Sequence, residues 1–134
     1  MNLWDKCVDF HGHCCGGLRI GYAAAEYAMK LLNISFSDNE QVVCISENDA
    51  CGVDAIQVML GCSIGKGNLL FHMTGKQAFS FYNRATGESV RLVLKPKGMG
   101  VWAAKRIRIR MEGEDADVES IYHRYFIQFL STGG

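Results

Sequence analysis

The segment from Leu18 to Leu32 carries apolar side chains at intervals of three and four residues, which is the period of one face of an α-helix. These side chains belong to Leu18, Tyr22, Ala25, Met29 and Leu32. A helix with one apolar face needs a surface that buries it, and the alanines on this face allow close packing against a sheet. The segment therefore predicts a long helix that ends near Asn33, with a sheet beneath it.

Patterns before and after this helix predict the other elements of one domain, which spans residues 1–134. The expected elements are helices at 3–10 and 52–60, strands at 41–46 and 68–73, and a hairpin at 77–94 with its turn at 84–87. Pro96 closes the hairpin because proline cannot extend a strand ladder. Helices and antiparallel strands are mixed without strict alternation. The predicted fold class is therefore α+β, a mixed or antiparallel sheet with helices packed on it.

The carboxyl-terminal part is less uniform. Arginines alternate with apolar residues over residues 101–111, which locally favours a strand. The position of this stretch, between a hairpin and an acidic helix start, also fits a helix. Residues 114–130 predict a helix, because acidic residues occupy the first turn and an apolar face includes Ile121 and Tyr125.

Charge and hydropathy exclude several classes of partner. Lysine plus arginine equals aspartate plus glutamate, at 14 each, so no net charge favours nucleic acid or an anionic membrane. No uninterrupted apolar run approaches the ~20 residues of a membrane-spanning helix. The first residues also lack the basic-then-apolar order of a signal peptide. We expect a soluble cytoplasmic protein with no nucleic-acid or membrane partner.

Six cysteines and four histidines are the chain's most unusual chemical feature. The cysteines are Cys7, Cys14, Cys15, Cys44, Cys51 and Cys62. Thiols stay reduced in the cytoplasm, so their clustering indicates metal or redox chemistry rather than a disulfide framework. The alternative is that several are small buried apolar residues, above all Cys44, which sits in a β-branched run.

The densest cluster of candidate ligands lies at residues 10–17. His11, His13, Cys14 and Cys15 fall within five residues, and imidazole and thiolate are the preferred ligands of zinc and related metals. His11 and His13 would point the same way in an extended segment, whereas a helix would separate them. Two glycines then open the long helix, whose amino end lowers the pKa of a nearby thiol. Cys15 is the better placed of the two neighbouring cysteines. The alternative is a glycine-rich helix entry with incidental histidines.

A second cluster, residues 48–57, follows the expected strand at 41–46 and runs into the next helix. Loops at the carboxyl ends of strands often build functional sites. Asp49 and Cys51 would add a carboxylate and a thiolate to the first cluster, although Asp49 also fits a simple helix cap.

A third cluster, residues 61–68, superficially resembles a phosphate-binding loop. It has three residues rather than four before Gly-Lys, and it lacks the Ser or Thr that holds magnesium, so a nucleoside triphosphate site is rejected. We expect a compact loop that brings Cys62 and Lys66 to the same pocket as the other clusters. Lys66 would suit an anionic substrate or a thiolate.

The three clusters together resemble the FmdE family of formylmethanofuran dehydrogenase subunits. The resemblance rests on Phe-His-Gly-His at 10–13 with Cys15 and Gly17, on the stretches 49–57 and 61–69, and on Gly75–Phe79 with 81–84 after them. It implies an α+β core, commonly dimeric, with a metal-binding cleft lined by the His-Gly-His-x-Cys motif. It also favours a helix over residues 101–111.

Three features of this chain depart from the family's pattern. Larger relatives carry a carboxyl-terminal treble-clef zinc finger with paired Cys-x-x-Cys motifs, and no cysteine follows Cys62 here. We therefore expect the core domain alone. Gly16 stands where the family usually has proline, and Cys14 is not a family signature. Neither the shape of this loop nor a role for Cys14 follows from the resemblance.

The first hypothesis for function is a metal-binding accessory or carrier protein of a redox or metalloenzyme system. Its ion would be a divalent transition metal, with zinc expected first and nickel or iron as alternatives. The ligands would be His11, His13, Cys15 and Cys51, with Asp49 or Cys62 completing or orienting the set. The expected partners are a second copy of the chain, in a homodimer, and a metalloenzyme.

Two other hypotheses remain open. The chain would be an enzyme if Cys15, or a metal-bound water, attacked a small substrate with the help of Lys66 or Asp49. It would be a structural component of a dimer if its cysteines served only packing.

Overall fold

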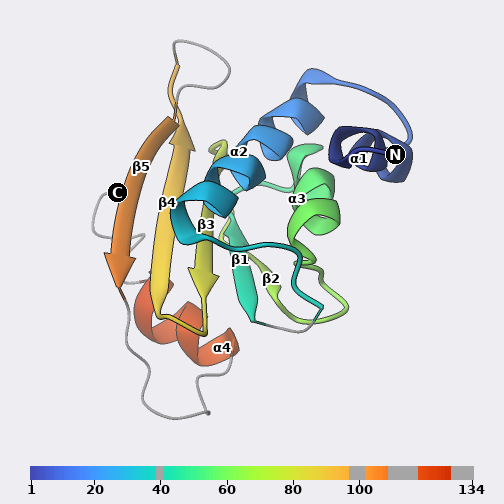
Figure 1. Ribbon diagram of the computed structural model, residues 1–134. Helices are drawn as coiled ribbons and strands as arrows, with labels where there is room; N and C mark the ends of the chain where they lie inside the picture. Colours follow the sequence, from blue (N-terminus) through green and yellow to red (C-terminus); the bar gives the residue numbers. More distant parts are fainter. Residues whose placement is uncertain (39–40, 97–101, 109–117, 128–134) are drawn as a thin grey trace.

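One mixed five-stranded sheet forms the centre of the computed structural model (Figure 1). The structure describes residues 1–38, 41–96, 102–108 and 118–127. The strands are β1 (Val42–Ser46), β2 (Leu69–Phe71), β3 (Ala78–Asn83), β4 (Glu88–Leu94) and β5 (Trp102–Arg108). Their order in the sheet is β2-β1-β3-β4-β5. The pair β1–β2 is parallel and the other three pairs are antiparallel.

Three helices cover one face of this sheet, and a short helical segment lies on the other. The helices are α1 (Leu3–His11), α2 (Gly16–Leu32), α3 (Gly52–Leu60), α4 (Val118–Ser120) and the π-helix η1 (Ile121–Phe126). In Figure 1, α2 crosses in front of the central strands, with α1 and α3 beside it. The α+β class and the elements expected in residues 3–94 are confirmed.

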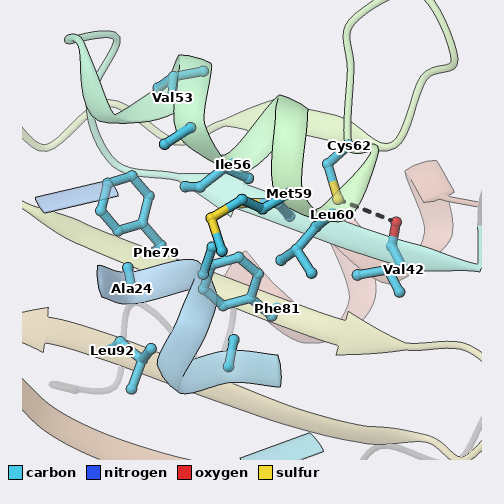
Figure 2. Packing of buried hydrophobic residues seen from close by; sticks show 14 of the residues in the cluster. Ala24, Val42, Val53, Ile56, Met59, Leu60, Cys62, Phe79, Phe81 and Leu92 are labelled. Atoms are coloured by element: carbon cyan, nitrogen blue, oxygen red, sulfur yellow. Dashed lines mark hydrogen bonds between the residues drawn. The ribbon is translucent and has the colours of Figure 1, made fainter. Parts of the chain in front are cut away.

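Alternation along β1 assigns its side chains to two cores. Val42 and Cys44 pack with the helices, whereas Val43 and Ile45 pack with Val118 and other residues on the opposite face. All five residues of β1 are buried, as expected for a central strand covered on both faces. Figure 2 shows the larger core, where Phe79 and Phe81 of β3 meet side chains of α2 and α3.

Glycines bring α2 and α3 into close contact. A Cβ at Gly21 would overlap the backbone of Gly52, and a Cβ at Gly17 would lie 3.1 Å from the Cβ of Cys51. Because no side chain separates the two helices here, their first turns lie side by side. This crossing brings the residue before α2, Cys15, close to the residue before α3, Cys51.

A buried ion pair fixes the segment that follows β1. Glu47 is 1% exposed and accepts two hydrogen bonds from Arg91, which is 3% exposed, at 2.7 and 2.9 Å. The hydroxyl of Thr74 donates a third, at 3.0 Å. Burial alone would raise the pKa of Glu47, but the bonds from Arg91 and Thr74 outweigh burial and lower it. The loop that carries residues 48–51 therefore starts from a rigid point.

The structure settles the ambiguous stretch in the carboxyl-terminal part. Trp102–Arg108 form strand β5, paired with β4, so the local alternation predicted correctly and the helix implied by the family resemblance is wrong. The ends of the 101–111 prediction lie outside the described residues. Helical structure is confirmed for 118–127 within the expected helix at 114–130, and the remainder is not described. Across the described ranges, no helix combines the length and apolar character needed to cross a bilayer.

Candidate metal centre

The turn after α1 places two histidine rings side by side. His11 is the last residue of α1, and Gly12 ends the helix in the left-handed conformation at φ 96°, with its N–H donated to the Val8 carbonyl. This sharp reversal brings the ring of His13 to 4.4 Å from the ring of His11, centroid to centroid. The two side chains therefore meet because the helix ends between them. Residues 11–13 form neither the extended segment nor the continuous helix considered from the sequence.

Cys15 caps the amino end of α2 with its sulfur. The backbone N–H of Leu18 donates to the Sγ atom at 3.4 Å, as expected of a side chain at a helix start. This bond lowers the pKa of the Cys15 thiol, and Cys51 and His11 lower it further, while partial burial opposes them. The expectation that a helix terminus would activate Cys15 is thus consistent with the geometry.

Three ligand-type side chains converge at this point. The atoms that His11, His13 and Cys15 can offer to an ion all lie within 4.8 Å of one another. The Sγ of Cys15 is 3.8 Å from Nε2 of His11. Sulfur and nitrogen ligands of one tetrahedral zinc ion lie about 3.6 Å apart, given bond lengths of ~2.3 and ~2.1 Å. The donor set therefore fits a single zinc-type ion: the Cys15–His11 pair is already near this spacing, and the other separations, at most 4.8 Å, would shorten on binding.

Asp54 orients His11 for such an ion. Its Oδ2 lies 2.7 Å from Nδ1 of His11, whose side chain is 12% exposed. The Asp54 carboxylate raises the pKa of His11, while partial burial opposes the rise. A proton held on Nδ1 by Asp54 leaves the Nε2 lone pair facing Cys15, and this carboxylate–histidine arrangement is common in zinc proteins. The histidine therefore has a defined ligand atom.

Asp54 was not among the candidates selected from the sequence. The available signal was its spacing, since Asp54 follows Cys51 by three residues and so lies on the same face of the helix start. Its contact with His11 joins residues 43 positions apart, which the local pattern does not reveal.

Cys51 lies next to the candidate metal centre but is not one of the three residues whose ligand atoms lie within 4.8 Å of one another. It is half-buried and lies beside Cys15, and the interaction of the two thiols raises the pKa of Cys51 and lowers that of Cys15. A Cβ at Gly17 would lie 3.1 Å from the Cβ of Cys51, closer than ordinary contact, so the glycine allows the starts of α2 and α3 to approach this closely. Clusters distant in the sequence, at 11–15 and at 51–54, therefore meet.

Three other predicted site residues lie elsewhere. Cys62 is fully buried in the core, where its thiol donates to the Val42 carbonyl at 3.5 Å (Figure 2). Lys66 donates to the Ser37 carbonyl at 2.6 Å. Asp49 is exposed, and it is not the residue that caps α3, because that position belongs to Cys51. Among the residues that the structure describes, none of these three belongs to the group of close ligand atoms.

A family model matches most of the chain, over residues 10–132, and its description is "FmdE, Molybdenum formylmethanofuran dehydrogenase operon". The chain belongs to the FmdE family. The FmdE match includes the complete centre, from His11 to Asp54.

Two known proteins are similar to this member of the FmdE family. A tungsten formylmethanofuran dehydrogenase FmdE-like protein from Syntrophus aciditrophicus has a crystal structure that superposes with a TM-score of 0.65 at 22% identity, covering 84% of this chain and 76% of that one. A probable S-adenosyl-L-methionine-binding protein of Archaeoglobus fulgidus is 26% identical over 127 residues, which cover 87% of this chain. The chain spans 35% of the length of that relative. The structural likeness supports the α+β fold.

Proposed function

We propose that this FmdE-family protein is a metal-binding accessory protein that holds one soft divalent ion, zinc in the first instance, for a redox metalloenzyme system. The proposal rests on one observation, the convergence of His11, His13 and Cys15 within 4.8 Å. Nitrogen and thiolate donors favour zinc, nickel or iron over magnesium or calcium. A bound ion of this kind would supply Lewis-acid chemistry at the centre.

The neighbouring residues would prepare the ligands. Asp54 keeps the Nδ1 proton of His11 in place, which fixes the ring and makes Nε2 a better donor. The Leu18 N–H donates a hydrogen bond to the Cys15 sulfur, and both Leu18 and Cys51 lower the pKa of that thiol, so the thiolate needed for metal binding forms more readily. Cys51 is the candidate for a fourth ligand because its thiol interacts with that of Cys15.

Metal content tests this proposal directly. Protein purified without added metal should contain close to one equivalent of a transition metal by elemental mass spectrometry, and a His11→Ala, Cys15→Ala double variant should contain almost none. A His72→Ala, Cys14→Ala variant is the matched control, because it removes the same two side-chain types outside the group of close ligands. Near-zero content in both the unaltered protein and the first variant would refute metal binding.

A thiol-dependent enzyme is the second candidate. The observation that favours it is the chain of contacts from Cys15 Sγ to His11 Nε2, 3.8 Å, and from His11 Nδ1 to Asp54 Oδ2, 2.7 Å. A thiol, a histidine and an orienting acid in this order form the arrangement of nucleophilic cysteine enzymes. In such an enzyme His11 would accept the thiol proton, and Asp54 would stabilise the charged ring.

The coordination shell distinguishes the two candidates. X-ray absorption on the metal-loaded protein should report two nitrogen and two sulfur ligands, with one sulfur lost in Cys51→Ser, if the ion is held for structure or transfer. A shell of three protein ligands and one exchangeable water would favour catalysis instead. Sedimentation would test the proposed homodimer, and cytoplasmic location stays a prediction.

A further inference from the structure

A second concave site lies beside the metal centre, on the side of α1 and α3 toward residues 61–66. It is a cavity of about 300 Å³, a size suited to a small organic molecule. Its lining includes Phe10, Phe36, Gln57, Val58, Ser63 and Lys66. The lining thus combines apolar side chains with the polar groups of Gln57, Ser63 and Lys66.

One charged group enters this cavity. The Lys66 ammonium lies 5.2 Å from the centre of the Phe36 ring and donates one hydrogen bond, at 2.6 Å, to the Ser37 carbonyl. An ammonium has three N–H donors, so further donors remain for a ligand. None of the lining residues is acidic. Over the part of the chain that the structure describes, the cavity therefore combines apolar side chains with one positive charge and no carboxylate in its lining.

The charged end of the cavity is held in place by the fold. Asn68 is fully buried and braces the loop, because it accepts from the Ser63 N–H at 2.9 Å and donates to the Gly61 carbonyl at 3.2 Å. The Ser63 hydroxyl accepts from the Lys66 N–H at 3.2 Å and keeps its own proton to donate. Lys66 and Ser63 thus offer donors to the same region.

The open side of the cavity exposes two aromatic rings. Phe10 is 57% exposed and Phe36 is 52% exposed. Large apolar side chains that line a cavity and also face solvent are typical of binding sites, since a ligand would remove them from water.

We propose that this cavity binds a small molecule with an apolar body and a single anionic head group. The head group would accept hydrogen bonds from Lys66 and Ser63, and the body would lie between Phe10 and Phe36. This inference goes beyond the proposed metal binding and does not depend on it. Phe10 adjoins His11 on α1, and Gln57 follows Asp54 by about one turn of α3, so the ligand would lie next to the metal centre.

A series of equal-length probes tests the charge requirement on the unaltered, metal-free protein. Octanoate, octanol and octylamine share an apolar chain and differ in the charge of the head group. Calorimetric titration should show octanoate binding at least about tenfold more tightly than octanol, the effect of one charge-assisted hydrogen bond, and octylamine binding most weakly. Equal affinities for the three probes, or no binding by any, would overturn the proposal.

Variants assign the charge to Lys66. Lys66→Met should remove the preference for octanoate over octanol, Lys66→Arg should keep it, and Lys30→Met, an exposed lysine of α2, should leave it unchanged. A preference that survives Lys66→Met would overturn the proposal. The comparison of probes on the unaltered protein keeps the test decisive if Lys66→Met folds poorly.

A further variant separates the cavity from the metal centre. Octanoate should bind His11→Ala, Cys15→Ala as tightly as it binds the unaltered protein. Binding that required added zinc and vanished in this variant would show that the carboxylate coordinates the ion, which would overturn the proposal while supporting metal binding. Octanoate binding by an unaltered protein that takes up no zinc even when zinc is added would instead support the cavity and refute only the metal centre.

Discussion

Two pairs of cysteines in this protein have opposite environments. Cys15 and Cys51 lie at the first turns of α2 and α3, partly open to solvent, and the Leu18 N–H lowers the pKa of Cys15. Cys44 and Cys62 lie in the core, where burial raises the pKa of Cys44 far above its ordinary value and that of Cys62 to about 12. Cys15 therefore has thiolate character, whereas its neighbour Cys51, whose pKa is raised by Cys15, and the two core thiols favour the protonated form.

The difference in environment between the two pairs arises from the secondary-structure element that carries each cysteine, not from the residues next to that cysteine in the sequence. Backbone N–H groups at a helix start have no partner within the helix, so they stabilise a negative sulfur. A residue inside β1, such as Cys44, has its backbone groups paired and its side chain surrounded by apolar atoms. A cysteine there serves as a small apolar residue.

The largest expected difference between the pairs is in alkylation rate. In metal-free protein at neutral pH, iodoacetamide should modify Cys15 readily, whereas Cys44 and Cys62 should react at least about a thousandfold more slowly because they require unfolding. Mass spectrometry of peptides from a Cys14→Ala background would give the separate rates, since Cys14 is exposed beside Cys15. Labelling of Cys62 at the rate of Cys15 would show that the core pair is accessible.

The next largest effect should come from Asp54. Replacing it with asparagine keeps the shape but removes the charge that orients His11, so the affinity for zinc should fall roughly ten- to a hundredfold. Competition with a chromophoric chelator measures this change. Asp49→Asn is the matched control, since this exposed carboxylate lies in the same loop region but outside the ligand group. Equal losses in both variants would remove the special role of Asp54.

Local patterns predicted most of the fold because each pattern reports on its own segment. The apolar spacing of α2 and the strand–turn–strand pattern of β3 and β4 are examples. The same reasoning succeeded for β5, where arginines alternate with apolar residues and the strand pairs with β4. The family resemblance indicated a helix there, and it was wrong because the motifs that carry the resemblance end at residue 84 and give no information on the backbone of β5.

The candidate site was predicted only in part because its contacts are tertiary. The dense cluster at 11–15 was visible in the sequence, but its pairing with Asp54 depends on how α1 packs against α3. Cys62 illustrates the opposite error, since a cysteine in a glycine-rich loop looked available as a ligand. In the fold its thiol donates a hydrogen bond to the Val42 carbonyl, which also accepts one from the side-chain amide of Asn68. Spacing in the sequence alone does not distinguish a residue that joins the site, such as Asp54, from one that is buried in the core, such as Cys62.

A smaller effect concerns stability. Cys44→Ser places a hydroxyl in an apolar part of the core, which should lower the free energy of unfolding of the metal-free protein by about 1–3 kcal/mol. Cys51→Ser should leave the midpoint of denaturant unfolding nearly unchanged, because its side chain is partly solvated. Urea titrations followed by circular dichroism provide both values. The reverse ranking would mean that the core pair is loosely packed.

The smallest effect should be the change in the Cys15 pKa when one neighbour is removed. The Leu18 N–H is the main cause of the lowered pKa and stays in place, while His11 adds a lesser contribution, so His11→Ala should raise the pKa of Cys15 only part of the way to its ordinary value. The native state favours the thiolate. The contribution of the Cys15 thiolate to stability is therefore complete above the ordinary thiol pKa and is lost as the pH falls through the lowered value.

Alkylation rates of Cys15 against pH, in metal-free protein, measure the shift in its pKa in each variant. The core thiols serve as the internal reference, because a Cys62 pKa of about 12 provides almost no thiolate over the same pH range. An unchanged Cys15 profile in His11→Ala would show that the helix terminus and Cys51 lower the pKa of Cys15 without a contribution from His11.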